Sequence, residues 1–338
     1  MSTSKVNLPD IPLYVTKAFP IRIQANPHHR EVESESYEWF DKYGIYADDK
    51  RENFLSPEFG LMTALLCPTV YASPLRIMMD FTLWFFSFKS MVDKNEFDSP
   101  EKLRGATDAL MRAANDASAP NKTFKPAAML QSCFQRIRQD GSPAVVRRLV
   151  TGVDEYTEAC FQERFNLSTS PTLEEYIELR RGTGGTKLWS AMLQYVIGVD
   201  LPDEVVDHPS VSGLTITAND VLILSQEIYS SILLRGEGHP LNIVSIAMHH
   251  NKDLDLNGSI QLVDKVIKKR LDEYMNIKTD LPSFGPGVDE QVAEYLQAIE
   301  NSIHGFIEWA FMTPTYFGHQ AKSARETGVV DLNMLAPT

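Results

Sequence analysis

Apolar residues recur with the period of an α-helix along almost the whole chain, and alternating runs of β-branched residues are few. Proline is well tolerated in the first turn of a helix, so Ser-Pro pairs mark candidate helix starts. Five such pairs divide the chain: Ser56-Pro57, Ser73-Pro74, Ser99-Pro100, Ser142-Pro143 and Ser170-Pro171. Further amphipathic stretches follow until about residue 312. The pattern predicts an all-α protein.

The helices are expected to form one large domain. The chain has 338 residues, of which 43% are hydrophobic, enough for a large core. No internal repeat and no low-complexity linker divides it. We therefore predict a single α-helical domain over residues 1–338, a bundle around a central apolar cavity. Residues 1–25 and 319–338 are expected to be loosely ordered arms that pack over an opening.

Composition excludes several classes of partner. The net charge of −13 argues against nucleic acid, because binding phosphates requires clustered Lys and Arg. The longest apolar run, residues 83–88, ends at Lys89 and is too short to span a membrane. The polar start of the chain does not resemble a signal peptide. Three cysteines without paired spacing predict neither disulfides nor a zinc site. We expect a cytoplasmic protein.

Several segments resemble one enzyme family in order and spacing. They are Asn26 to Phe40, Phe59 to Pro68, Asp80 to Phe86, Tyr176 to Gly185, Leu201 to Val205, Ala218 to Ile243, Leu281 to Ser283 and Trp309 to Gly318. Together these segments resemble the fungal class I terpene synthases, a family of sesquiterpene synthases, over roughly residues 20–318. The resemblance implies a helical bundle and a small hydrophobic terpenoid substrate. It also implies a site where three Mg²⁺ ions and cationic side chains hold a diphosphate.

The first metal motif of that family begins and ends with an Asp four positions apart, on one helix face. Here the matching residues are Lys89 and Asp93. A lysine ammonium donates hydrogen bonds and offers no lone pair to Mg²⁺. This motif therefore predicts a cation where the family has its leading metal ligand.

The second metal motif places oxygen ligands at positions i, i+4 and i+8. The matching residues are Gln226, Ser230 and Leu234, and leucine has no oxygen to offer. Asn219-Asp220 is a tempting earlier start, but the ungapped match that continues to Asn242 favours Gln226. The tridentate site is therefore predicted to be broken.

The family also binds diphosphate through two arginines. The C-terminal Arg-Tyr pair is replaced by Thr315-Tyr316, whereas Arg180 matches the diphosphate sensor and keeps an anion-binding position. The combined replacements predict no metal cofactor, with Mg²⁺ as the alternative.

The candidate site residues take two roles. Lys89, Asp93 and Glu227 are candidate proton donors, and Lys89 with Tyr316 and Arg180 are candidates to hold a carbonyl or carboxylate. The candidate catalytic residues are Lys89, Asp93, Glu227 and Tyr316. The candidate substrate-binding residues are Phe81, Phe85, Phe88, Arg180, Gln226, Ser230, Leu234, Trp309 and Thr315, the aromatic members forming cavity walls.

Three functions are compatible with this pattern. The first is a repurposed enzyme that cyclises a hydrophobic terpenoid lacking a diphosphate, without metal, by a pericyclic or proton-initiated reaction. The second is a Mg²⁺-dependent sesquiterpene synthase acting on farnesyl diphosphate. The third is a non-catalytic terpenoid-binding protein. The sequence leaves open whether the protein is a monomer or a homodimer.

Overall fold

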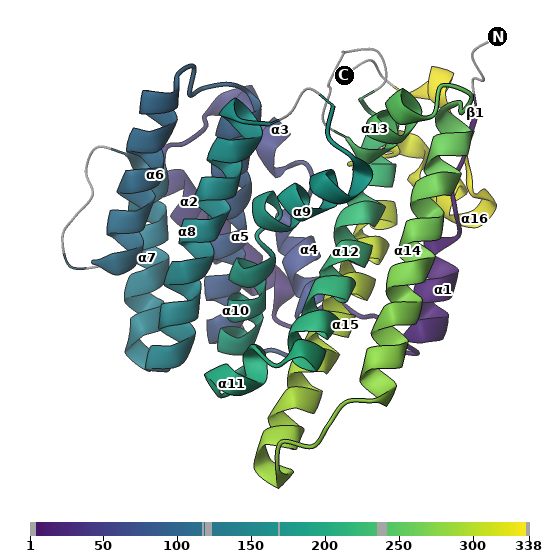
Figure 1. Cartoon of the computed structure of the whole chain (residues 1–338). Coiled ribbons are helices and arrows are strands. Elements are labelled where there is room, and N and C mark those ends of the chain that lie inside the picture. The colour runs from purple at the N-terminus through teal and green to yellow at the C-terminus, as the bar shows by residue number, and fades with distance from the viewer. Residues whose placement is uncertain (1–4, 117, 119–123, 168–169, 235–241, 336–338) are drawn as a thin grey trace.

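The computed structural model describes residues 5–116, 118, 124–167, 170–234 and 242–335. Helices form nearly all of the regular structure in these ranges, as the periodicity predicts (Figure 1). The α-helices are α1 Ile11–Ala18, α2 His29–Tyr43, α3 Asp48–Leu55, α4 Phe59–Leu66, α5 Ala72–Asp93, α6 Pro100–Asn115, α7 Lys125–Asp140, α8 Pro143–Phe165, α9 Leu173–Thr183, α10 Thr186–Ile197, α11 Asp203–Val206, α12 Pro209–Ser231, α13 Ile243–His250, α14 Leu256–Thr279, α15 Pro286–Met312 and α16 Ala321–Thr327. Two short 3-10 helices, Gly318–Gln320 and Leu332–Met334, and strands β1 Lys5–Asn7 and β2 Val329–Asp331 complete the description.

The Ser-Pro starts are confirmed where the serine caps the helix. The side chains of Ser99 and Ser142 accept hydrogen bonds from the backbone N–H groups of the first turns of α6 and α8. Ser56-Pro57 does not open a helix directly, because α3 ends at Leu55 and α4 begins only at Phe59. Similarly, α9 begins at Leu173 because Thr172, not Ser170, forms a capping box with Glu175.

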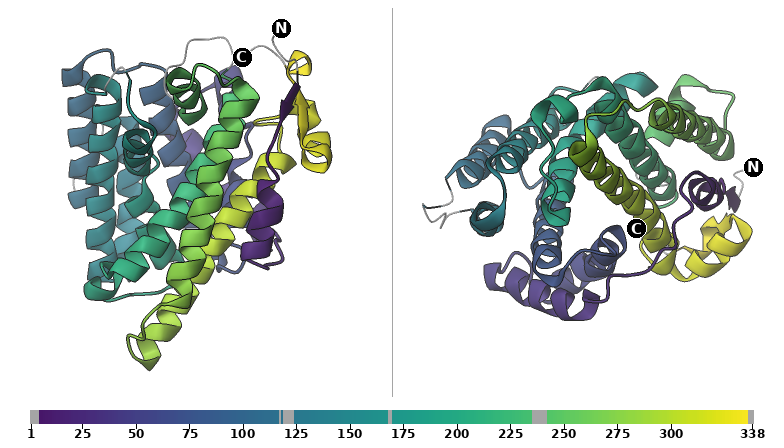
Figure 2. Two further views of the ribbon diagram at one scale, coloured as in Figure 1. Left: turned by 45° about the vertical axis from the view of Figure 1, so that its right-hand side comes forward. Right: turned by 90° about the horizontal axis from the view of Figure 1, so that it is seen from below.

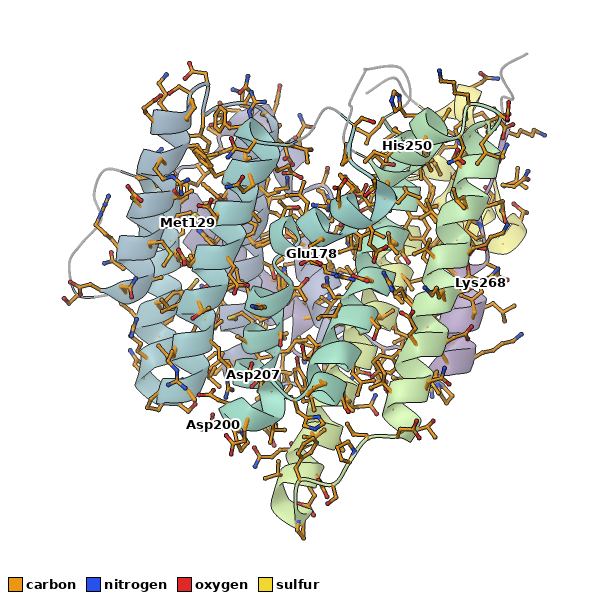
Figure 3. The ribbon with its side chains drawn as sticks, in the orientation of Figure 1. Met129, Glu178, Asp200, Asp207, His250 and Lys268 are labelled. Atoms are coloured by element: carbon orange, nitrogen blue, oxygen red, sulfur yellow. The ribbon has the colours of Figure 1, made fainter. Side chains whose placement is uncertain are left out.

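The helices around the centre of the bundle pack closely. Helix α12 packs between α14 and α15, α10 packs against α8, and α15 packs against α4. Viewed from below, the long helices run roughly along the line of sight (Figure 2). The α15–α4 contact requires a glycine, because a Cβ added to Gly305 would lie 2.5 Å from the Leu65 backbone. Charged side chains such as Glu178, Asp200 and Lys268 are exposed on the surface (Figure 3).

The two ends of the chain differ from the expectation of loosely ordered arms. Strand β1 pairs antiparallel with β2, and the partners Val6 and Val330 are both fully buried. Ile11, Val15 and Phe19 of the N-terminal segment are also buried. Burial of these apolar side chains fixes residues 5–25 and 319–335 to the bundle. Residues 1–4 and 336–338 lie outside the described ranges. Among the described helices, none combines the length and the hydropathy needed to cross a bilayer.

Candidate active site

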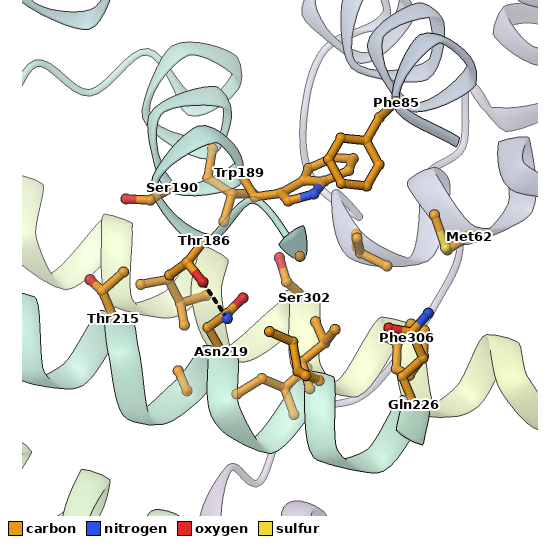
Figure 4. A pocket seen from close by; sticks show the side chains of 18 of the residues that line it. Met62, Phe85, Thr186, Trp189, Ser190, Thr215, Asn219, Gln226, Ser302 and Phe306 are labelled. Carbon is orange, nitrogen blue, oxygen red and sulfur yellow. Dashed lines mark hydrogen bonds between the residues drawn. The ribbon is translucent and has the colours of Figure 1, made fainter. Parts of the chain in front are cut away.

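A cavity of about 140 Å³ lies between α4, α5, α9, α10, α12 and α15 (Figure 4). Its walls are mainly apolar, as predicted for the bundle. The apolar lining residues are Met62, Leu66, Met78, Phe85, Phe86, Trp189, Leu193, Ala218, Leu222, Ile223, Ile299, Ile303 and Phe306. The charged lining residues are Lys89 and Arg180. Lys89 also lines an adjoining surface groove, so these cations mark the mouth of the cavity.

At the mouth, two carboxylates surround the ammonium group of Lys89. The Lys89 Nζ lies 2.6 Å from Asp93 Oδ1, one turn further along α5, and 2.9 Å from Glu163 Oε2 on α8. The Lys89 side chain is 17% exposed. Burial alone would lower the pKa of Lys89, but the two carboxylates outweigh burial and raise it. Lys89 is therefore a permanent cation at the position that the sequence resemblance assigns to the first metal ligand.

Glu163 is a site residue that no sequence motif indicates. Burial would raise the pKa of its carboxyl group, but the Lys89 and Arg180 cations outweigh burial, and the pKa lies below its ordinary value. Glu163 follows the buried Tyr156 and Cys160 at i+7 and i+3 on one face of α8. The signal that the sequence offered for Glu163 was a charged residue on a helix face whose other members are buried.

Arg180 and Glu227 form a second buried ion pair. The Arg180 Nε lies 3.0 Å from Glu227 Oε1, and Arg180 Nη1 donates to Thr183 Oγ1 at 2.6 Å. The other carboxylate oxygen of Glu227 accepts from the Tyr176 hydroxyl at 3.2 Å and from the Ile243 backbone N–H at 3.0 Å. Glu227 therefore acts as an acceptor on both oxygens. Glu227 does not line the cavity, and the proton-donor role expected for it from the sequence stays a prediction.

The second metal motif is divided between the cavity and its surroundings. Gln226 lines the cavity. Ser230 donates to the Glu227 backbone carbonyl at 3.3 Å and accepts from Asn242 Nδ2 at 3.2 Å. Leu234 is half-buried and lies outside the cavity lining. The register that begins at Gln226 thus brings one of the three residues to the cavity.

The C-terminal pair, Thr315 and Tyr316, lies outside the cavity lining. Tyr316 is buried and interacts with the Gln226 side chain, and neither Tyr316 nor Thr315 lines the cavity. The Thr315 hydroxyl is 2.8 Å from that of Thr313. Neither residue reaches the cavity lining, and the roles expected for Tyr316 and Thr315 at the substrate stay predictions.

Of the four predicted aromatic walls, Phe85 lines the cavity and the other three belong to the surrounding core. Phe81 packs edge-on against Trp189, and Phe88 packs against Tyr156. The Trp309 Nε1 donates to the Pro57 carbonyl at 2.6 Å. Phe81 and Phe88 were misplaced because helix positions 81, 85 and 88 span more than the face that meets the cavity. Trp189, Phe86 and Phe306 provide the aromatic surface that the sequence did not indicate.

Comparison with known proteins decides the family. The family model described as "Terpene synthase family 2, C-terminal metal binding" matches residues 80–273. The chain belongs to the terpene synthases. Sesquiterpene synthase 3 of Postia placenta is 31% identical, with 92% of this chain and 85% of that protein covered. Sesquiterpene synthase Agr1 of Cyclocybe aegerita is 29% identical, with 98% and 94% covered.

Solved terpene synthase structures share the fold. The germacradien-4-ol synthase of Streptomyces citricolor superposes with a TM-score of 0.76, covering 92% of this chain and 99% of that chain at 18% identity. The class I terpene synthase fold expected from the sequence is confirmed.

The Mg²⁺ ions that terpene synthases of this class use do not fit the residues at the mouth. Mg²⁺ requires oxygen ligands in octahedral geometry. Asp93 instead faces an ammonium group, and Leu234 of the second motif has no oxygen. Among the described residues, no group of three or more His, Cys, Asp or Glu side chains is arranged to hold a metal ion. The donor set at the mouth therefore differs from a trinuclear magnesium site.

Proposed function

We propose that this terpene synthase closes rings in an isoprenoid without metal-assisted loss of diphosphate. The observation that carries the proposal is the Lys89 ammonium, held by Asp93 and Glu163 where the family has a metal ligand. This side chain occupies both nearby carboxylates and repels a metal cation. The same cation, together with Arg180, favours a substrate oxygen that carries partial or full negative charge.

Of the two metal-free reactions, the geometry favours a pericyclic ring closure over a proton-initiated one. Protonation of an alkene requires a neutral acid that faces the substrate, and no carboxyl group of the described residues lines the cavity. Lys89 is a weak acid because its pKa is raised. A pericyclic closure needs a folded reactive conformer and a hydrogen bond to a carbonyl group. The apolar walls and the cations of Lys89 and Arg180 supply these.

Arg180 can donate a hydrogen bond to a substrate carbonyl group, because its bonds to Glu227 and Thr183 use only some of the N–H groups of its guanidinium. Within the described ranges, Arg180 Nη2 has no hydrogen-bond partner, and the residue lines the cavity. Arginine remains protonated at any physiological pH, and the charges around Arg180 raise its pKa further despite burial. We assign to Arg180 Nη2 the role of holding the substrate carbonyl or carboxylate at the mouth.

The second candidate function is a Mg²⁺-dependent sesquiterpene synthase that acts on farnesyl diphosphate. The relatives favour it, since the Agr1 protein and Sesquiterpene synthase 3 are named as sesquiterpene synthases and match nearly the whole chain. The family model is likewise described by metal binding. The comparisons support this candidate more strongly than the first, and the donor set at Lys89 and Leu234 supports the first.

One experiment separates the candidates. The purified protein is incubated with farnesyl diphosphate, and separately with a linear isoprenoid that carries a conjugated diene and an enal, each with Mg²⁺ or with EDTA. The proposal predicts faster, stereoselective ring closure of the enal in EDTA, and its loss in the Arg180→Met variant. Release of diphosphate that needs Mg²⁺ and stops in EDTA overturns the proposal in favour of the second candidate. Saturable binding without turnover of either compound overturns both in favour of a binding protein.

A further inference from the structure

A group of hydroxyl-bearing side chains lies at the end of the cavity remote from Lys89. Thr215 and Gln226 both line the cavity from α12. Gln226 marks the mouth, because the next residue, Glu227, pairs with Arg180. The two residues are eleven positions apart, which is about 16 Å of helix rise. Near Thr215, the hydroxyl of Tyr295 on α15 is 3.0 Å from Thr215 Oγ1 and 2.5 Å from Ser190 Oγ on α10. We call this end, with Asn219, Thr186 and Ser302, the floor of the cavity (Figure 4).

The hydrogens of the Tyr295 cluster are all used within the protein. Each hydroxyl group has one hydrogen to donate. Three hydrogens serve three contacts, of which one is the bond from Thr215 to the Val211 backbone carbonyl at 3.0 Å. All three contacts are satisfied at once when Tyr295 donates to Thr215 and Ser190 donates to Tyr295. Ser190 therefore presents lone pairs, and no hydrogen, to the cavity.

The remaining floor side chains follow the same pattern. Thr186 donates to the Arg181 carbonyl at 2.9 Å, and Ser302 donates to the Ala298 carbonyl at 2.9 Å. Asn219 Nδ2 donates to Thr186 Oγ1 at 2.5 Å, which fixes the orientation of the amide. Within the described part of the chain, Asn219 Oδ1 has no partner and its residue lines the cavity.

The two ends of the cavity are therefore complementary to different oxygen groups. The mouth offers donors, from Arg180 and Lys89, which match a carbonyl or carboxylate. The floor offers acceptors, Ser190 Oγ and Asn219 Oδ1, together with the second N–H of Asn219. An alcohol both donates and accepts, so it matches the two acceptors and the Asn219 N–H together, whereas a carbonyl group would use the N–H and leave both acceptors unfilled. An unfilled acceptor in an apolar cavity is unfavourable, so an apolar chain end also fits the floor poorly.

We propose that the floor is a hydroxyl subsite. The substrate is then an oxygenated isoprenoid with an alcohol at the end remote from the oxygen that Lys89 and Arg180 hold. This inference rests on the proposed function only in that the same cavity holds the substrate.

Binding, without turnover, tests the subsite. Three ligands are compared by titration calorimetry: farnesoic acid, the same acid with a hydroxyl group on its terminal methyl carbon, and the methyl ether of that hydroxyl. The hydroxylated acid is expected to bind about fivefold more tightly than either of the others, the effect of one neutral hydrogen bond. The methyl ether keeps the oxygen but loses the hydrogen, so it isolates donation to the floor.

Matched variants identify the acceptors. Asn219→Leu and Ser190→Ala each remove a floor acceptor, and the pair of substitutions is expected to abolish the preference for the hydroxylated acid. Thr217→Val is the control, because Thr217 lies on the same helix, bonds the Gly213 carbonyl at 2.8 Å and does not line the cavity. The control is expected to keep the full preference.

Each other outcome overturns the inference. Equal binding of the three acids by the unmodified protein means that the floor holds a water molecule or nothing, not a substrate hydroxyl. A preference that survives the double substitution places the hydroxyl elsewhere, and failure of all three acids to bind excludes the subsite as well. Mg²⁺-dependent turnover of farnesyl diphosphate would overturn the proposed function but leave the binding preference intact, so the two failures are distinguishable.

Discussion

At the scale of single residues, the mouth of the cavity is built from charges that neutralise one another, most of them buried. Lys89 is paired with the buried Glu163 and the exposed Asp93, and Arg180 is paired with the buried Glu227. Such charges lose hydration on burial, so each depends on its partner more than an exposed pair does. The free energy of unfolding that is lost when one partner is removed therefore measures how strongly the remaining charge depends on its pair.

We predict that Arg180→Met lowers the free energy of unfolding by about 3 kcal/mol, because it leaves the Glu227 carboxylate buried without its cation. The side chains of Arg180 and Glu227 are 9% and 7% exposed. Adding Glu227→Gln is expected to recover part of the loss. Urea denaturation monitored by circular dichroism measures both. The control is Arg147→Met at the exposed Arg147–Asp203 pair, expected to change stability by less than about 1 kcal/mol. Equal effects at the two sites would contradict the prediction.

The pH dependence of stability is expected to reflect Glu163. Lys89 and Arg180 hold the pKa of Glu163 below its ordinary value despite burial. A carboxyl group with a lowered folded-state pKa contributes stability above its unfolded pKa, about 4.3, and loses it as the pH falls through the folded-state pKa. Glu163→Gln should therefore destabilise the protein at neutral pH and flatten the decline of stability below about pH 4.3. Thermal unfolding between neutral and acid pH measures this, with Glu294→Gln, at an exposed position of α15, as the control. A decline as steep as in the unmodified protein would count against the role of Glu163.

The residues of this network were only partly predictable. Lys89 and Asp93 share a helix face at i and i+4, so their proximity follows from helical geometry. Glu163 comes from another helix, 74 residues after Lys89, and its approach depends on how α5 and α8 pack. The same limit explains why Phe85 was placed correctly but Phe81 and Phe88 were not: periodicity gives a helix its buried side, and tertiary packing decides which part of that side meets a cavity.

At the scale of elements, the helices were predictable where a local signal fixed their ends. Ser99 and Ser142 cap α6 and α8, and these starts follow from the sequence. The start of α4 was not predictable, because Glu58 before it adopts a left-handed conformation, with φ of 57°, that no residue type there indicates. The close approach of α15 to α4 at Gly305 was not predictable either, because a glycine within a helix does not indicate which residue packs against it.

The α15–α4 contact yields a prediction at this scale. Gly305→Ala should destabilise the protein by about 2 kcal/mol, because the new methyl group would overlap the Leu65 backbone, which cannot move as a side chain would. Gly105→Ala is the matched control: Gly105 lies in α6, and a Cβ added there would meet no atom within 4 Å. That substitution should stabilise the protein by about 0.5–1 kcal/mol through helix propensity. Chemical denaturation of the two variants compares them, and a neutral Gly305→Ala would show that α15 and α4 are less tightly packed.

At the scale of the whole molecule, periodicity was sufficient to predict an all-α bundle with an apolar cavity. It was not sufficient for the ends of the chain, because β1 and β2 have three residues each and their partners lie more than three hundred residues apart. The polarity of the cavity also emerges only at this scale. Ser190, Thr215 and Tyr295 come from three helices, and no motif links them.

The central claim is that the Lys89 ammonium has taken the place of a metal ligand. Titration calorimetry of inorganic diphosphate, with and without Mg²⁺, tests it on the unmodified protein and on Lys89→Asp, which restores an acidic residue beside Asp93 and Glu163. The account predicts that Mg²⁺ changes the affinity of the unmodified protein for diphosphate less than twofold, and that Lys89→Asp makes diphosphate binding respond to Mg²⁺. A tenfold or greater increase in affinity on adding Mg²⁺ to the unmodified protein would contradict it.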